Sequence, residues 1–141
     1  MTIETRGVDA ALAYLRDHAD ENMRGLDEFL RIESVSADPA RTNEVRRTAQ
    51  WVADELTRIG VDNAQLHETS GHPIVTGDWL HAGEDAPTVL VYCHYDVQPA
   101  DPLDEWIRPP FEPRYEDDRV YARGSGDDKG QQTSCEGAVV S

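Results

Sequence analysis

The run Thr88-Val89-Leu90-Val91-Tyr92-Cys93 constrains the fold of this chain more than any other segment. It is a nearly continuous stretch of β-branched and aromatic residues, which is typical of a strand buried on both faces of a parallel or mixed sheet. A strand of this kind needs neighbouring strands and covering layers. The sequence therefore predicts an α/β fold with helices first, then a mixed sheet in which residues 88–93 are central.

Three stretches before residue 60 carry apolar residues at helical spacing, which predicts three helices with core-facing sides. The positions are Val8, Ala11, Leu12 and Leu15 in the first, Leu26, Phe29, Leu30 and Ile32 in the second, and Val45, Ala49, Val52, Leu56 and Ile59 in the third. We expect Asp20 to cap the second helix and Thr42 or Asn43 to cap the third. Gly60 is a suitable residue to end the third helix.

The periodicity changes after Gly60. Residues 64–68 and 73–80 read as short strands, the second of them an edge strand, and five of the eight prolines then fill a long loop between residues 99 and 113. Residues 114–116 and 119–121 flank Asp117-Asp118, which predicts a hairpin.

The charge balance excludes two classes of partner. The formal net charge is −15, and neither nucleic acid nor an anionic membrane attracts such a chain. No segment is long and apolar enough to span a membrane, and residues 1–6 do not resemble a secretory signal. With two cysteines, Cys93 and Cys135, we expect a reduced, cytoplasmic protein with free thiols.

Two polar clusters carry the candidate chemistry. His94 and Asp96 follow the apolar run, and residues two apart in an extended chain face the same side. An imidazole with a neighbouring carboxylate suits zinc, although a core or surface histidine is the simpler alternative. The second cluster is Asp127-Asp128 in a glycine-rich loop; its alternative is an acidic surface turn with Lys129 as a solvated counter-charge.

These clusters carry a family resemblance. Residues 89–99, with His94-Tyr95-Asp96-Val97-Gln98-Pro99, resemble the first metal motif of the di-zinc metallopeptidases of family twenty, in the carnosinase-type dipeptidase branch. Residues 121–131, with Gly126-Asp127-Asp128-Lys129-Gly130, resemble its second motif. The resemblance extends over roughly residues 25–131 and implies the N-terminal part of a three-layer α/β catalytic domain.

The resemblance also implies roles for single residues. His94 would ligate one zinc ion and Asp127 would bridge two. Asp96 has the one catalytic role implied within this chain: it would hydrogen-bond His94 and raise its basicity. Asp128, Gly126 and Gly130 would shape the loop, where the family often has an irregular peptide bond after the bridging aspartate. Two Zn²⁺ ions, or Co²⁺ or Mn²⁺ in their place, would activate a water molecule for hydrolysis of a dipeptide or similar small amide.

The chain departs from the family pattern after Gly130. In the family, an adjacent glutamate pair supplies the general base, and later residues supply the other metal ligands. A lid domain mediates dimerisation. We find no counterpart of these three features in this sequence, and Glu136 is at the wrong spacing to replace the pair. The histidines at positions 18, 67, 72 and 81 read as surface or loop residues. Residues 131–141 lack helical periodicity, and Gly137 and Val139-Val140 oppose a helix. We therefore divide the chain into residues 1–130, the N-terminal part of the catalytic domain, and an atypical tail at 131–141, explained by a frame change, a premature stop or a genuine difference.

Three functional alternatives remain open on the sequence. The first is a zinc-dependent dipeptidase, here in a truncated form that we expect to be inactive alone. The second is a non-catalytic fragment with weak or no metal binding, and the third a deacylase or deacetylase of the same superfamily. Since a truncated sheet leaves apolar faces exposed, we also expect marginal stability or aggregation.

Overall fold

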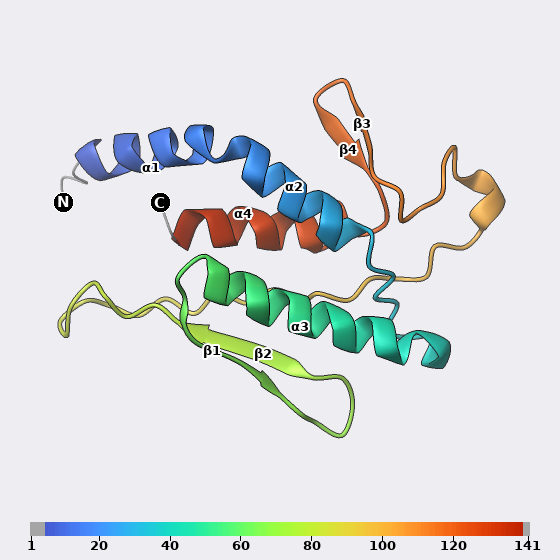
Figure 1. The fold of residues 1–141 in the computed structure, drawn as a ribbon, viewed down its shortest axis with the longest axis horizontal. Helices are drawn as coiled ribbons and strands as arrows, with labels where there is room; N and C mark the ends of the chain where they lie inside the picture. The colour runs from blue at the N-terminus through green and yellow to red at the C-terminus, as the bar shows by residue number, and fades with distance from the viewer. Residues whose placement is uncertain (1–4, 140–141) are drawn as a thin grey trace.

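The computed structural model describes residues 5–139. Residues 1–4 and 140–141 lie outside the described residues. They include part of the segment tested for a secretory signal and the end of the atypical tail. The helices and strands follow in the order α1 Thr5–Asp17, α2 Ala19–Leu30, α3 Thr42–Arg58, β1 Asp62–His67, β2 Ile74–Asp78, β3 Arg114–Glu116, β4 Arg119–Tyr121 and α4 Lys129–Val139 (Figure 1). Single-turn helices at Pro39–Arg41 and Leu103–Glu105 lie in the connections.

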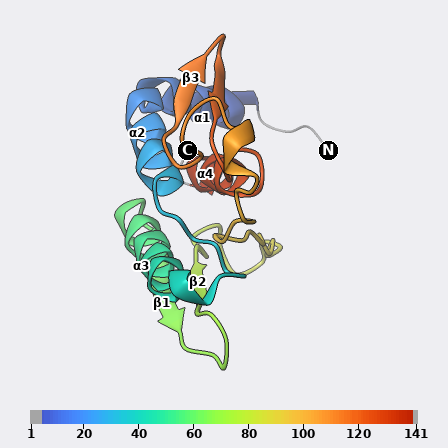
Figure 2. The same ribbon diagram turned by 90° about the vertical axis from the view of Figure 1, so that its right-hand side faces the viewer.

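The elements form two groups that lie side by side. Helix α4 packs against α2 and touches α1, whereas α3 covers the β1–β2 hairpin. Figure 2 shows α1, α2, α4 and the β3–β4 hairpin in one group, with α3, β1 and β2 in the other. The turn that follows α2 connects the two groups.

The apolar faces of α2 and α3 supply most of the core, as the sequence predicts. Leu26, Phe29 and Leu30 are buried in α2, and Val45, Ala49 and Val52 are buried in α3. Phe29 stacks on Trp51 of α3, with ring centroids 4.5 Å apart, so that the two helices share this core. The prediction for α1 is wrong in part, because Val8 and Leu12 are exposed. That helix meets only parts of α2 and α4, which leaves much of its apolar face open.

The predicted helix caps are confirmed at one of three positions. Gly60 ends α3 with a left-handed φ of 87°, which a glycine adopts without steric cost. The cap at Asp20 is wrong, because α2 already begins at Ala19, after His18. Neither Thr42 nor Asn43 caps α3. Instead, Asp38 caps the single turn before it and accepts the amide of Ala40 at 2.9 Å.

Both predicted pairs of short strands form antiparallel hairpins. Strand β1 pairs with β2 so that Leu66 lies opposite Val75, and β3 pairs with β4 so that Tyr115 lies opposite Val120. The turn between β3 and β4 places Asp117 and Asp118 at φ values of 50° and 57°, as a tight two-residue hairpin turn requires.

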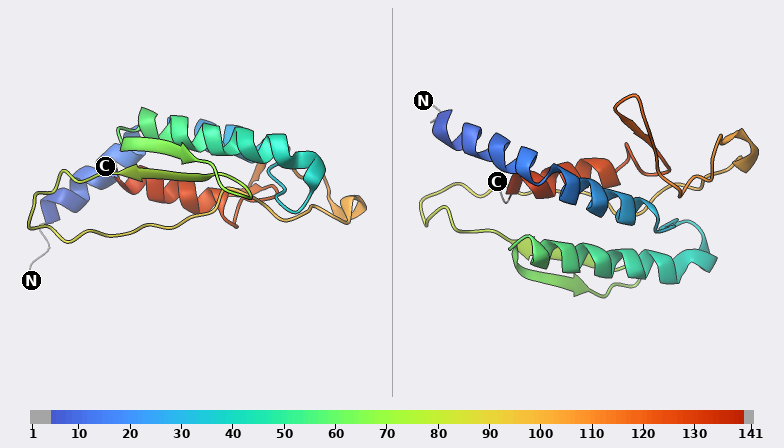
Figure 3. Two further views of the ribbon diagram at one scale, coloured as in Figure 1. Left: turned by 90° about the horizontal axis from the view of Figure 1, so that it is seen from below. Right: turned by 45° about the horizontal axis from the view of Figure 1, so that its top comes forward.

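The predicted central strand at residues 88–93 is wrong for this structure. The run is extended but pairs with no strand among the described residues, and Val89, Leu90 and Tyr92 are 80, 91 and 85% exposed. Figure 3 shows it as a bare trace along the molecule. The described strands form two separate two-stranded antiparallel sheets, and the parallel bridge between Val35 and Val97 is the contact closest to the predicted mixed sheet.

The expectation that the tail opposes a helix is also wrong, since α4 runs from Lys129 to Val139. Packing against α2 overrides the weak propensity of this segment. Gly137 allows α4 to approach α1 closely as well, because a Cβ at this position would lie 3.1 Å from the Leu15 side chain of α1. Gln132 and Glu136 lie on the buried face of α4.

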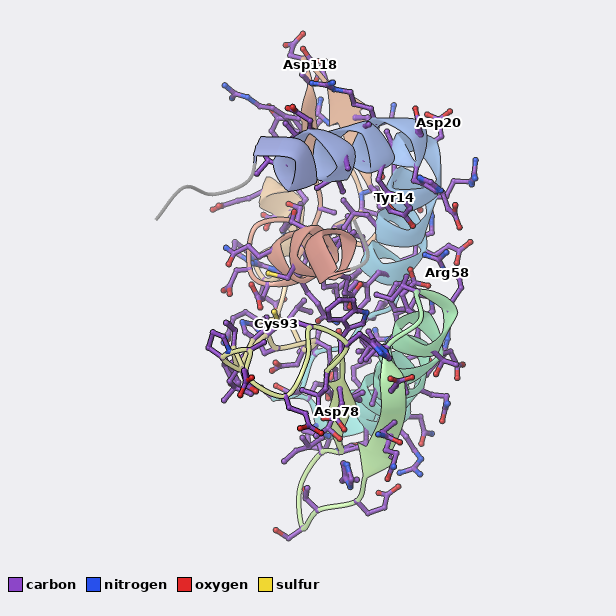
Figure 4. All side chains as sticks on the ribbon, turned by 90° about the vertical axis from the view of Figure 1, so that its left-hand side faces the viewer. Tyr14, Asp20, Arg58, Asp78, Cys93 and Asp118 are labelled. Atoms are coloured by element: carbon purple, nitrogen blue, oxygen red, sulfur yellow. The ribbon has the colours of Figure 1, made fainter. Side chains whose placement is uncertain are left out.

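Two smaller observations complete the fold. Cys93 and Cys135 are free thiols, as predicted, and Cys93 lies beside α4 (Figure 4). Within residues 5–139, no helix has the length and apolar character needed to cross a bilayer.

Candidate metal centre

The turn after α2 fixes the segment that carries His94. The Ser34 hydroxyl donates to the Tyr95 carbonyl at 2.8 Å, and the Val97 amide donates to the Ser34 carbonyl at 2.9 Å. The Ser36 hydroxyl donates to the Asp96 carboxylate. These bonds join residues about 60 positions apart in the sequence, so the turn after α2 determines where the His94–Asp96 segment lies.

His94 lies between two carboxylates. Its Nδ1 is 3.0 Å from Oδ1 of Asp96, and its Nε2 is 2.9 Å from Oδ1 of Asp127. A neutral imidazole has one N–H and therefore donates to only one of them, whereas an imidazolium donates to both. Partial burial lowers the pKa of His94, but the hydrogen bonds with Asp127 and then Asp96 outweigh burial, so the pKa is raised overall. The site therefore favours positive charge.

The loop before α4 supplies the second carboxylate. Asp127 is exposed and points at His94, whereas the neighbouring Asp128 is buried and accepts the His94 amide at 3.1 Å. The peptide bond between Asp127 and Asp128 is cis, which matches the expected irregular bond at this position. The structure thus brings together all four acidic and imidazole residues that the sequence singled out.

The two predicted loop glycines differ in what they do. A Cβ at Gly130 would lie 2.1 Å from the Ser125 carbonyl oxygen, so the loop requires a glycine there. A Cβ at Gly126 would meet nothing within 4 Å, so no close approach requires that glycine. The sequence analysis missed Gly124, which has φ 89° and whose Cβ would lie 2.7 Å from a Val97 methyl group.

Lys129 is also placed differently from the expectation. It is not a solvated counter-charge, because its side chain is fully buried and its Nζ donates to the Phe29 and Ile32 carbonyls at 2.9 and 2.8 Å. Burial lowers the pKa of Lys129 to about 7, although the charge of Asp96 opposes this effect. No feature of the motif in the sequence predicts this burial, since the partner carbonyls belong to the last turn of α2 and to the residues just after it.

The remaining histidines have other hydrogen-bond or stacking partners. His81 contacts Asp62 at 2.8 Å, and His67 contacts Thr76 at 2.8 Å. His18 stacks on Tyr14, and His72 lies 3.1 Å from the Ser36 carbonyl. Glu136 contacts Gln132 rather than His94.

The donor set fits part of a metal site. Zinc binds imidazole nitrogen and carboxylate oxygen at about 2.0–2.2 Å, so two such donors 2.9 Å apart are close enough to share one ion. Within residues 5–139, however, no group of three or more His, Cys, Asp or Glu side chains is arranged to hold a metal. His94 and Asp127 are therefore a pair of candidate ligands, with Asp96 orienting the imidazole.

Comparisons with known proteins agree with the resemblance in the sequence. Residues 90–135 match the model of the peptidase family M20/M25/M40. A Cys-Gly metallodipeptidase, DUG1, from Candida albicans is 38% identical over 121 residues, which cover 74% of this chain and 24% of that protein. A human Beta-Ala-His dipeptidase is 34% identical over 134 residues, covering 87% of this chain and 26% of its own length.

The fold agrees as well. The crystal structure of human carnosine dipeptidase 1 superposes with a TM-score of 0.79 and 30% identity, over 94% of this chain and 30% of that one. The predicted fold class is thus confirmed as a mixed helix-and-sheet portion of such a catalytic domain. The chain spans about a quarter of the length of the curated relatives that it matches. The family implies a divalent metal cofactor.

Proposed function

Because the chain carries part of the catalytic domain of the M20 metallopeptidase family, we propose that His94 and Asp127 are ligands of a divalent metal, zinc, in a metallo-dipeptidase centre. The observation that carries this proposal is the 2.9 Å approach of His94 Nε2 to Asp127 Oδ1, from motifs 33 residues apart. Two donors at this separation are close enough to bind one cation together.

Each residue has a distinct part in this proposal. Asp96 accepts the Nδ1 proton of His94, which leaves Nε2 as the metal-binding atom and fixes the plane of the ring. Asp128 holds the His94 backbone through its amide, so the imidazole and the Asp127 carboxylate keep their relative positions. A bound zinc ion would lower the pKa of a water ligand and polarise the amide carbonyl of a substrate.

The proposed substrates are dipeptides. Both curated relatives are named as dipeptidases, which supports small peptides over acyl amides. Cobalt and manganese remain alternatives to zinc, since the same donors bind them. Dimerisation through a lid domain, a cytoplasmic location and the nature of the chain after Gln131 stay predictions.

A second candidate is metal binding without hydrolysis by this chain alone. It rests on the donor count, because His94 and Asp127 supply two ligands where four-coordinate zinc takes four. We expect weak, water-completed binding and no cleavage of dipeptides by the isolated chain.

Zinc titration by calorimetry tests both candidates on the full chain. We expect one site for the wild type, no measurable binding for His94→Ala or Asp127→Ala, and an affinity about 10- to 100-fold lower for Asp96→Asn. A parallel assay with a dipeptide should give no hydrolysis, and hydrolysis by the purified chain would refute the second candidate.

His81 and Asp62 provide a matched control. They form an exposed histidine–carboxylate pair at 2.8 Å, similar to the candidate pair in composition but remote from the loop. His81→Ala and Asp62→Ala should leave the titration unchanged. Loss of zinc binding in these variants, or its survival in His94→Ala and Asp127→Ala, would overturn the ligand assignment.

A further inference from the structure

Three consecutive residues of the loop before α4 contact three different parts of the molecule. The Asp127 carboxylate meets the His94 ring, and the Asp128 carboxylate accepts the His94 amide. The Lys129 ammonium extends the other way, to the carbonyls of Phe29 and Ile32 at the end of α2. Neither metal binding nor hydrolysis as proposed above uses Lys129.

The end of α2 is a favourable place for a buried cation. The last carbonyls of a helix lack partners within the helix, and the helix dipole places partial negative charge there. The Lys129 ammonium also lies 4.8 Å from the centre of the Phe29 ring, which adds a cation–π attraction. Three favourable contacts thus offset part of the cost of burying this side chain.

The contacts form a closed circuit around the candidate ligands. Lys129 binds the end of α2, its chain neighbour is Asp128, and the Asp128 carboxylate accepts the His94 amide. From His94 the chain continues to Asp96, which Ser36 binds, and Ser34 and Ser36 belong to the turn that follows α2. The end of α2 and the turn that follows it therefore hold both motifs, the first through the serine hydroxyls and the second through Lys129.

We propose that Lys129 is a positioning residue: by binding the end of α2, it holds the Asp127 loop where the carboxylate can share a cation with His94. This inference rests on the proposed metal function of that pair. Lys129 itself touches neither the imidazole nor the Asp127 carboxylate in the hydrogen bonds described, and it acts through the backbone of its own loop.

Lys129→Met tests the proposal on the full chain. Methionine has a similar length but cannot bind the two carbonyls. We expect zinc affinity to fall at least about 10-fold, the lower range for loss of a supporting contact around a metal. We also expect amide hydrogen exchange at His94 to be at least about 10-fold faster than in the wild type. In each protein the rate is taken relative to that of the Val52 amide of α3.

Val45→Ala is the matched control for a loss of stability. Val45 is fully buried in α3 and makes none of the contacts in the circuit, so its truncation destabilises the chain without releasing the loop. This variant should keep wild-type zinc affinity and wild-type relative exchange at His94. A similar loss of affinity in both variants would mean that Lys129 contributes only to stability.

The outcomes separate this inference from the metal assignment. If the wild type binds zinc and folded Lys129→Met binds it equally well, the positioning role is wrong and the ligand pair stands. If the wild type binds no zinc, the assignment of the ligand pair is wrong. In that case, unchanged amide hydrogen exchange at His94 in Lys129→Met would show that the positioning role is wrong too. Should Lys129→Met fail to fold in buffer, the comparison is made in sucrose, which favours the compact state.

Discussion

Glu136 illustrates at the scale of one residue how burial makes stability depend on pH. Burial raises its pKa to about 7, whereas the hydrogen bond from Gln132 and the charge of Arg58 lower it and Glu55 raises it. In the unfolded chain a glutamate has its ordinary pKa of 4.5. Between these two values the folded state keeps a proton that the unfolded state has lost. Stability therefore decreases as pH rises from 4.5 to about 7 and is level above that.

Glu136→Gln should remove this pH dependence. The amide keeps an acceptor for Gln132 and has no charge to bury, so we expect it to stabilise the chain by about 3 kcal/mol at pH 8 and by little at pH 4. Urea unfolding at both pH values measures the difference. Glu28→Gln, at an exposed position of α2, is the control and should change little at either pH. Equal shifts for Glu136→Gln at pH 4 and pH 8 would contradict the assigned burial.

The loop glycines allow a second test at the residue scale. Gly130→Ala forces a Cβ to within 2.1 Å of the Ser125 carbonyl oxygen, and we expect a loss of more than about 2 kcal/mol. Gly126→Ala lies in open space and should stay within about 0.5 kcal/mol of the wild type. Thermal unfolding of the two variants decides the matter, and equal losses would show that the loop geometry is wrong.

At the scale of elements, the exposed run at residues 88–93 is the segment most prone to self-association. Its apolar side chains face solvent, and its backbone pairs with no described strand, so it offers an edge to which another chain can add. We expect Leu90→Lys to reduce self-association while changing the free energy of unfolding by less than about 0.5 kcal/mol, because Leu90 is 91% exposed.

Sedimentation velocity over a range of concentrations measures that effect. Leu80→Lys is the control, since Leu80 is exposed but lies outside the run. It should leave self-association as it is in the wild type. A monomeric wild type at all concentrations would remove the reason for the prediction and would also contradict the expected tendency to aggregate.

The elements also show which parts of the fold the sequence can predict. Helices α2 and α3 and the β3–β4 hairpin follow from local signals, namely apolar spacing and turn residues. Strands β1 and β2 were also predicted, but not that they pair with each other. The burial of residues 88–93 does not follow, because it depends on neighbouring strands that the described residues lack. Helix α4 was missed for the opposite reason: its own residues oppose a helix, and contact with α2 and Leu15 stabilises it.

At the scale of the whole molecule, the candidate site joins segments that the sequence could pair only by family resemblance. Local patterns identify His94, Asp96 and Asp127, but the spatial contact between them depends on the turn after α2. That turn binds one motif through Ser34 and Ser36, and the end of α2 binds the other through Lys129. The serines and the lysine were not predicted as part of the site, because their partners are backbone carbonyls or distant carboxylates.

The complete burial of Lys129 has a practical consequence, because it is the only lysine in the sequence. In the folded chain, this burial keeps an amine-reactive ester from the one lysine side chain. Burial lowers the pKa of the Lys129 amine to about 7, and opening of the loop would return the amine to solvent and to its ordinary pKa of 10.5. Acylation at this residue, read by mass spectrometry, thus reports the opening of the loop before α4 without any introduced label.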